Sequence, residues 1–203
     1  MGIVAAIDRF NQARPWSHNS HYYPWILRQL PARFGAALDV GCGSGDLAGL
    51  LAARADSVVG VDVDADIISH ATARPNVHHV TGDALALPDA RYDVITAVAS
   101  LHHMPLDEAL STFRRWLSPG GTLVVIGLTT RTPADYLLMP IATPANMLVS
   151  LRHGKGPRPV AMAAPVRAPN MTLRQLRAHV RRHLPGARIR RRLFFRYSLV
   201  YRA

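Results

Sequence analysis

The chain has 203 residues, of which 49% are hydrophobic, so it can bury one full core and is not disordered as a whole. Its single cysteine, Cys42, excludes an internal disulfide and favours a reducing compartment, so we expect a cytoplasmic protein. We expect no signal peptide and no transmembrane segment, because no apolar stretch has the length or the flanks of either.

The formal net charge of +11 is unevenly placed along the chain. Residues 1–135 hold all 13 acidic residues and 10 of the 24 basic ones, whereas residues 136–203 hold 14 basic residues and no acid. Such asymmetry indicates a polyanionic partner such as nucleic acid. The alternative is a genome-wide preference for arginine, since Lys155 is the only lysine.

The elements begin with an aromatic segment and continue as a strand–helix alternation. A helical period in residues 22–30 predicts an amphipathic helix that Pro31 ends. The pattern then predicts strands over 36–40, 57–61, 77–81, 92–99 and 122–128, with helices over 47–55, 65–73 and 106–117. The link 82–91 is too short for an ordinary helix, so that helix is missing or a single turn. This alternation predicts an α/β fold with a doubly wound, mostly parallel sheet.

The rhythm breaks after residue 128. Prolines punctuate residues 129–170, which include an apolar, helical piece over 136–151. Thr172 is a good N-cap for a last helix that runs to residue 184. Strands over 187–193 and 196–202 follow, and the short link between them predicts an antiparallel hairpin.

The most informative motif is L-D-V-G-C-G-S-G at residues 38–45, where a short apolar run ends in a glycine-rich turn. Such a turn lets backbone N–H groups approach a ligand with no side chain in the way. The spacing is G-x-G-x-G, because Asp46 stands where a dinucleotide-binding G-x-G-x-x-G motif would have its third glycine. The turn therefore predicts a nucleotide-like cofactor and does not by itself identify it.

Further polar residues follow the later strands, at the edge where open α/β sheets bind ligands. Asp62 can accept hydrogen bonds from ribose hydroxyls, as acids there do for both NAD and adenosyl cofactors. Asp83 can accept from an adenine amino group while the N–H of Ala84 meets a ring nitrogen. The loop 100–103, S-L-H-H, follows the fourth strand.

Together these motifs closely resemble the class I S-adenosylmethionine-dependent methyltransferases, and more narrowly the small-molecule branch labelled methyltransferase type 11. The residues concerned are L-D-V-G-C-G-S-G (38–45), V-V-G-V-D (58–62), T-G-D-A (81–84), Y-D-V-I-T-A-V-A-S-L-H-H-M (92–104) and L-S-P-G-G-T-L (117–123). The resemblance implies a seven-stranded sheet, whose last strand is antiparallel beside strand five. It also implies a single domain over 1–203: an N-terminal helical lid (1–35), a cofactor-binding core (36–128), a variable substrate-side insertion (129–170), and a last helix with the terminal hairpin (171–203).

The resemblance also implies S-adenosylmethionine as cofactor, S-adenosylhomocysteine as product, and a set of cofactor-binding residues. The glycines would approach the methionine part, Asp62 would hold the ribose, and Asp83 with its neighbours would hold the adenine. Asp39 would order the loop or meet the cofactor's amino group through water. The full set is Tyr22, Tyr23, Asp39, Gly41, Gly43, Gly45, Asp62, Val63, Asp83, Ala84, Leu85 and Ser100. Packing in the core is the alternative for the two tyrosines.

His102 and His103 are the candidate catalytic residues. The sulfonium is already electrophilic, so an enzyme needs to align the acceptor and to remove a proton, which a histidine suits. A purely structural role for both histidines is the alternative. The loop holds no acid for a metal and no N-P-P-Y-like tetrad, so we expect metal-free O-, N- or C-methylation of a small acceptor.

The apolar residues Leu138, Ile141, Met147 and Leu148 suggest an apolar or aromatic acceptor of secondary metabolism. Three other functions stay open at this point. One is a nucleic-acid methyltransferase that uses the basic C-terminal third, the second is a nicotinamide-dependent oxidoreductase, and the third is a cofactor-binding protein without catalysis.

Overall fold

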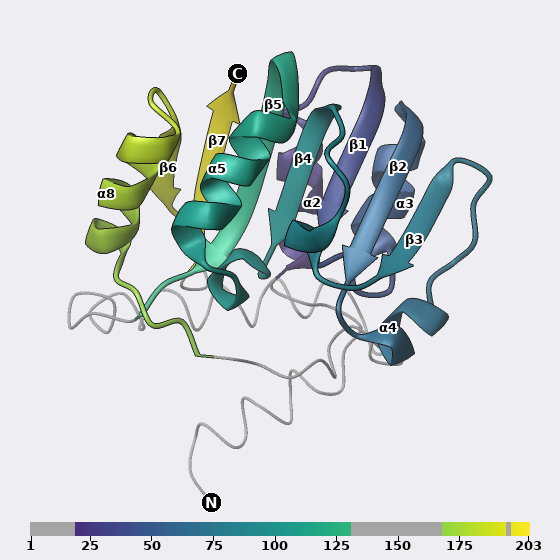
Figure 1. The fold of residues 1–203 in the computed structure, drawn as a ribbon, viewed down its shortest axis with the longest axis horizontal. Coiled ribbons are helices and arrows are strands. Elements are labelled where there is room, and N and C mark those ends of the chain that lie inside the picture. The colour runs from purple at the N-terminus through teal and green to yellow at the C-terminus, as the bar shows by residue number, and fades with distance from the viewer. Residues whose placement is uncertain (1–18, 131–167, 194–195) are drawn as a thin grey trace, which may run out of the picture.

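A computed structural model describes residues 19–130, 168–193 and 196–203. It contains a seven-stranded sheet in the order β3-β2-β1-β4-β5-β7-β6 (Figure 1). The strands are β1 (Phe34–Val40), β2 (Ala55–Asp62), β3 (Val77–Thr81), β4 (Tyr92–Val98), β5 (Leu117–Leu128), β6 (Arg188–Arg191) and β7 (Arg196–Arg202). β1 to β5 pair in parallel, while β7 is antiparallel to both β5 and β6. The predicted fold, including its C-terminal hairpin, is confirmed.

Helices cover both faces of this sheet. The α-helices are α2 (Tyr23–Leu27), α3 (Asp46–Ala52), α4 (Ala65–Ser69), α5 (Leu106–Trp116) and α8 (Leu173–His183). Short 3₁₀ turns are η1 (Ser20–Tyr22), η2 (Ala84–Ala86) and η3 (Leu101–His103). Figure 1 shows α5 and α8 in front of the sheet and α2 and α3 behind it. The link 82–91 contains η2, so the predicted single turn stands in place of a helix.

Two apolar clusters hold these layers together, one on each face of the sheet. Beneath α5 and α8, the cluster includes Phe113, Trp116, Leu176 and Val180. Behind the sheet, Ile26 of α2 and Leu51 of α3 are completely buried. Both clusters share the central strands, and this is why those strands are apolar on both sides.

Several predicted boundaries were wrong. The helix predicted over 22–30 is η1 followed by five residues of α2, and the helices predicted to end at 55 and 73 end at Ala52 and Ser69. β5 begins at Leu117 and not at 122, because the Pro-Gly-Gly segment stays in the strand with a register shift against β4. β6 is shorter than predicted. The predicted helical piece over 136–151 lies outside the described residues, as do residues 1–18 of the predicted lid.

Candidate active site

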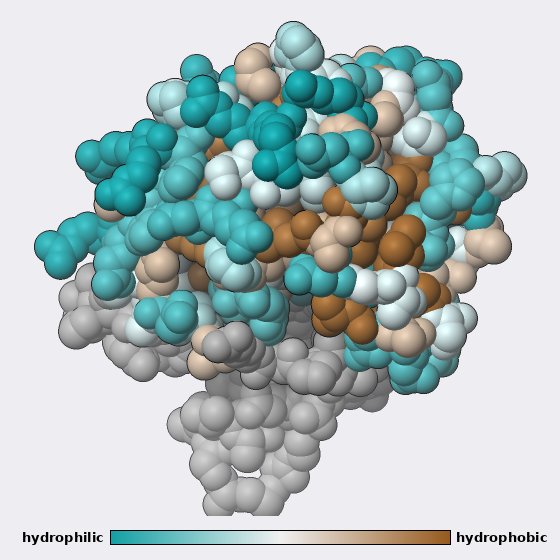
Figure 2. Space-filling model, viewed as in Figure 1, coloured by the Kyte–Doolittle hydropathy of each residue, from teal (hydrophilic) through white to brown (hydrophobic). Residues whose placement is uncertain are grey.

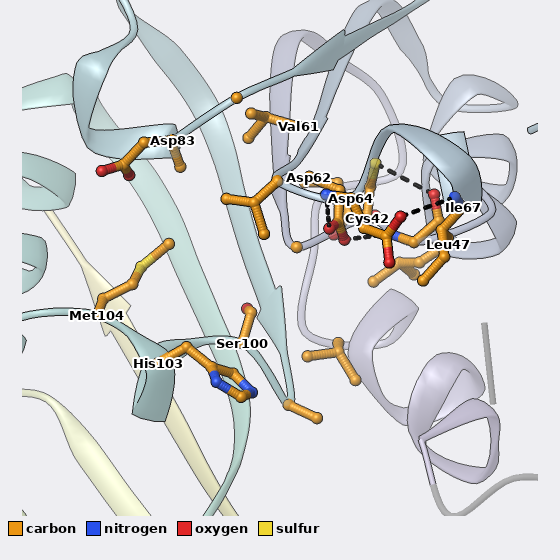
Figure 3. Close-up of a pocket in the computed structure, with 18 of the residues that line it drawn as sticks. Cys42, Leu47, Val61, Asp62, Asp64, Ile67, Asp83, Ser100, His103 and Met104 are labelled. Atoms are coloured by element: carbon orange, nitrogen blue, oxygen red, sulfur yellow. Dashed lines mark hydrogen bonds between the residues drawn. The ribbon is translucent and has the colours of Figure 1, made fainter. Parts of the chain in front are cut away.

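A cavity of about 810 Å³ lies at the carboxyl ends of β1 to β4. Figure 3 shows Asp83, Met104 and His103 on one side of it and Asp62, Asp64 and Ile67 on the other. Ten of the predicted site residues line it: Tyr23, Asp39, Gly41, Gly43, Asp62, Val63, Asp83, Ala84, Ser100 and His103. The volume lies within the range of small-ligand sites.

The glycine loop after β1 needs its first glycine for space as well as for backbone angle. Gly41 has a φ of 70°, and a Cβ there would lie 2.3 Å from Cβ of Ser100. Ser100 is fixed in turn, because its hydroxyl donates to the Val40 carbonyl oxygen at 2.6 Å. The backbone of Gly41 after β1 thus packs directly against the side chain of Ser100 after β4. A side chain at position 41 would push these two loops apart.

Asp62 joins the ends of β1 and β2. Its Oδ2 accepts the N–H of Gly43 at 2.9 Å, and its Oδ1 accepts the N–H of Asp64 at 3.1 Å. A carboxylate has about four acceptor positions, so two remain for a ligand in the cavity. Asp64 caps α4 by accepting the N–H groups of Asp66 and Ile67.

Asp39 is the buried carboxyl group at the wall of the cavity. The hydroxyl of Thr96 donates to its Oδ1 at 2.7 Å, while its buried Oδ2 has no hydrogen-bond partner among the described residues. Burial, opposed by the Thr96 hydrogen bond and reinforced by the nearby charge of Asp62, raises its pKa to about 7. A buried, unpartnered carboxylate oxygen beside a cavity fits a cationic group of a ligand.

The loop after β3 supplies Asp83 and Ala84 to the cavity wall. Oδ1 of Asp83 accepts the N–H of Leu85 at 2.9 Å and so starts η2. Leu85 therefore has its N–H in use and is not on the cavity wall, in contrast to its neighbour Ala84.

Gly45 and Tyr22 also lie away from this cavity wall. Gly45 is the N-cap of α3, and a Cβ there would lie 2.5 Å from the His79 ring. Tyr22 is buried, and its hydroxyl donates to the Leu193 carbonyl oxygen at 2.8 Å. Burial raises the pKa of Tyr22 to about 12. Of the two tyrosines, it is Tyr23 that reaches the cavity, where burial and then the nearby Asp39 and Asp46 raise its pKa.

A second cavity of about 350 Å³ adjoins the first. His102 and His103 both line it, with their ring centroids 4.1 Å apart. His103, Met104 and Pro105 line both cavities. The other described residues of the wall are Leu101, Leu106, Leu128, Thr129, Pro169, Asn170, Met171, Leu176 and Tyr197.

Sequence reasoning missed several of these lining residues. Asn170 and Met171 lie in a proline-rich stretch with no motif, and Met104 closes a motif without being singled out. Ala99 lines the first cavity with a φ of 56°, a left-handed conformation that costs a non-glycine residue about 1–3 kcal/mol and that composition does not reveal. Cys42 is buried, which raises the pKa of its thiol and keeps it protonated.

Within the described ranges, no group of three His, Cys, Asp or Glu side chains could hold a metal ion. None of the helices in that part of the chain is long and apolar enough to cross a membrane.

Comparison with known proteins agrees with this geometry. A family described as "Methyltransferase domain" matches residues 37–121. An uncharacterized methyltransferase of Mycobacterium tuberculosis is 35% identical over 197 residues, which cover 94% of this chain and 98% of that protein. The 27-O-demethylrifamycin SV methyltransferase of Amycolatopsis mediterranei is 30% identical over 175 residues, covering 72% of this chain and 60% of that protein.

The same fold is found in a solved structure. The S-adenosylmethionine-dependent methyltransferase of Mesorhizobium loti has a TM-score of 0.63 at 17% identity, over 90% of this chain and 97% of that one. Identity that low shows the fold alone. With the relatives above, it places this chain in the class I S-adenosylmethionine-dependent methyltransferases, as the five motifs predict. The protein is therefore a methyltransferase, and its fold and family imply the use of S-adenosylmethionine.

Proposed function

We propose that this protein transfers the methyl group of S-adenosylmethionine to a small organic acceptor in the second cavity and releases S-adenosylhomocysteine. The observation that carries the proposal is the wall that the two cavities share, formed by His103, Met104 and Pro105. These residues line both cavities, so the cavities are neighbours there. Direct transfer requires that the methyl group and the acceptor atom meet at this point with no side chain between them.

The residues of the larger cavity fit the cofactor. Asp62 has carboxylate positions left for ribose hydroxyls, and Asp83 with Ala84 forms the wall where an adenine would lie. Gly41 and Gly43 line the cavity where the methionine part would lie, and Ser100 fills the space beside Gly41. The unpartnered Oδ2 of Asp39 suits the amino group. When bound, the cofactor supplies an electrophilic methyl group on its sulfonium.

The second cavity indicates the kind of acceptor. Leu101, Leu128 and Leu176 give it an apolar wall, and Asn170 adds an amide that can hydrogen-bond a polar group. His102, His103, Thr129 and Tyr197 add further polar atoms. This mixed lining favours an acceptor with an apolar or aromatic body and a polar group, methylated on oxygen, nitrogen or carbon. The substrate named for the Amycolatopsis relative, 27-O-demethylrifamycin SV, also favours a small molecule. The acceptor pocket predicted from Leu138, Ile141, Met147 and Leu148 lies outside the described residues.

His103 is positioned to take a proton from the acceptor, because its side chain lies on the wall between the two cavities. The reaction then needs no metal ion. Family membership sets aside the nicotinamide-dependent oxidoreductase. A protein that binds the cofactor without catalysis is distinguished by the experiment below, and the cytoplasmic location stays a prediction.

Titration calorimetry with S-adenosylhomocysteine tests the cofactor site. We expect wild-type protein to bind it and Asp62→Ala to bind it about 1–3 kcal/mol more weakly, the usual cost of losing a hydrogen bond with a charged partner. Asp56→Ala is the matched control, because Asp56 is an exposed acid at the other end of β2. Absence of binding by folded wild-type protein would contradict the proposal.

Transfer itself is measured with radiolabelled S-adenosylmethionine and a panel of hydroxylated and aminated aromatic compounds. Methylation of at least one compound supports catalytic methyl transfer to a small acceptor. Cofactor binding without transfer to any compound that saturates the second cavity supports the non-catalytic alternative.

A further inference from the structure

Four arginines from three separate parts of the chain converge on a groove between α5 and α8. The groove has a volume of about 350 Å³ and is lined by Arg91, Ser111, Arg114, Arg115, Arg182 and His183. All four arginines are exposed. A concave surface with this lining is a candidate site for an anion.

Most of the positive charge in the groove is not neutralised. Nη1 of Arg91 donates to the carbonyl oxygens of Arg115 and Leu117 at 2.6 and 3.1 Å, and Nη1 of Arg114 donates to that of His183 at 3.2 Å. These acceptors carry no net charge. Each guanidinium has five N–H groups, so these bonds leave donors free for a ligand.

One carboxylate reaches the groove arginines within the described part of the chain. Asp89 lies 2.9 Å from Nη2 of Arg115, and both side chains are largely exposed, so the pair contributes little energy. The side chain of Arg182 makes no hydrogen bond or ion pair with any residue of the described ranges. The groove therefore keeps a net positive charge that a ligand can neutralise.

The charge continues along the exposed face of α8. Arg174, Arg177, Arg181 and Arg182 are exposed there, on the side of the helix away from the buried Leu176. The helix has no acidic residue. Figure 2 shows hydrophilic residues projecting over this side of the molecule. A uniform preference for arginine explains the choice of arginine over lysine, but not the absence of acids from this face.

The groove lies far from the larger cavity, in which we propose that the cofactor binds. Arg91 directly precedes β4, whose other end, Val98, lines that cavity. Seven residues of extended strand separate the two, which is about 23 Å. A phosphate group held in the groove lies too far from that cavity to be the methyl acceptor, so the groove is a separate binding site.

We propose that the α5–α8 groove binds closely spaced phosphate groups at a site distinct from the site of methyl transfer. Guanidinium groups suit this ligand, because their paired N–H donors match the oxygens of a phosphate. The groove can accept such groups from a free oligophosphate or from a nucleic-acid backbone. Contacts to phosphate oxygens carry no sequence information, so we expect binding in the groove to be independent of nucleic-acid sequence.

Two probes distinguish the sources: sodium triphosphate by calorimetry and a short fluorescent duplex RNA by anisotropy, each titrated between about 50 and 200 mM salt. Arg182→Ala should weaken binding at least tenfold, and it removes no side-chain hydrogen bond or ion pair within the described ranges. Arg28→Ala is the matched control, since Arg28 is an exposed arginine at the end of α2 behind the sheet. It should change binding less than twofold.

Binding of triphosphate that depends on Arg182 assigns the site to a free oligophosphate. Binding of the duplex alone assigns it to nucleic acid, and Arg182→Ala should then reduce the salt slope by about one. Absence of both, or an equal loss in Arg28→Ala, overturns the proposal. Binding of S-adenosylhomocysteine should be unchanged in Arg182→Ala, which confirms that this variant is folded.

Discussion

The hydroxyl of Thr96 on β4 donates a hydrogen bond of 2.7 Å to Oδ1 of Asp39 on β1, at the wall of the larger cavity. The other oxygen of Asp39 is buried and has no hydrogen-bond partner in the described ranges. The carboxyl group is thus held in place by one neighbour, and its second oxygen is buried at the cavity wall. Binding of a cationic group beside Asp39 should therefore favour the ionised form of its carboxyl group.

The affinity for S-adenosylhomocysteine should therefore rise with pH. The pKa of Asp39 is raised to about 7, so below pH 7 the group is mostly neutral and must lose a proton to meet an ammonium group. We expect affinity to rise about tenfold between pH 6 and 8 and then to level off. Calorimetry across this range measures it, with Asp39→Asn as the control. A slope that persists in Asp39→Asn would show that another group titrates.

The stability of the unbound protein should depend on Asp39 in the opposite direction. Because the folded state holds this proton more tightly than the unfolded state, the free energy of unfolding falls as pH rises from about 4 to 7. Asp39→Asn removes this dependence. Urea denaturation should therefore show that the variant gains stability relative to wild type between pH 5 and 8. A constant difference across this range would contradict the assigned pKa.

Gly41→Ala should damage both stability and cofactor binding. Its Cβ would lie 2.3 Å from Cβ of the buried Ser100, and Gly41 has a φ of 70°. Gly120→Ala is the matched control, since Gly120 has a φ of 78° with nothing within 4 Å of an added Cβ. Left-handed backbone alone costs about 1–3 kcal/mol. Urea denaturation should show a larger loss of unfolding free energy for Gly41→Ala than for Gly120→Ala. Equal losses would indicate that Ser100 can shift at little energetic cost.

The mostly parallel sheet and the position of the cavity could be predicted from the sequence, because the strand–helix alternation is regular and each of the first four strands has a motif at its carboxyl end. Asp62 and Asp83 reach the cavity since their loops are short and fixed by their own carboxylates. The positions of Tyr22 and Leu85 were not predictable. Tyr22 is held by the carbonyl of Leu193, 171 residues away, and such distant pairings leave no local pattern. The extended start of β5 was missed because its glycines normally end a strand.

Acid should weaken the contact between α5 and α8. Asp107 lies 2.6 Å from Nδ1 of His179 and 2.9 Å from Nε2 of His183, and the hydrogen bond from His179 is the main reason that its pKa is lowered. A carboxyl with a lowered pKa stabilises the fold above its unfolded pKa near 3.9, and this contribution is lost as pH falls through the folded value.

Asp107→Asn should therefore lower the melting temperature at pH 6, and its effect should shrink progressively as pH falls below about 4. Glu108→Gln makes the same charge change in the same first turn of α5, where Glu108 is exposed. At pH 6, Glu108→Gln should lower the melting temperature less than Asp107→Asn does. Scanning calorimetry measures both variants. Equal effects would indicate that Asp107 stabilises the protein only through the helix dipole and not through the two histidines.

Substituting His102 and His103 one at a time should separate the contribution of proton transfer from that of acceptor binding. His103 lines both cavities and His102 only the second. With an acceptor from the panel, His103→Ala should lower kcat about 10²–10⁴-fold, the usual contribution of general-base catalysis. It should leave the affinity for S-adenosylhomocysteine unchanged within about threefold. His102→Ala should mainly raise the KM of the acceptor. If His103→Ala keeps both its turnover and its pH profile, the proton leaves by another route and His103 only forms the wall between the two cavities.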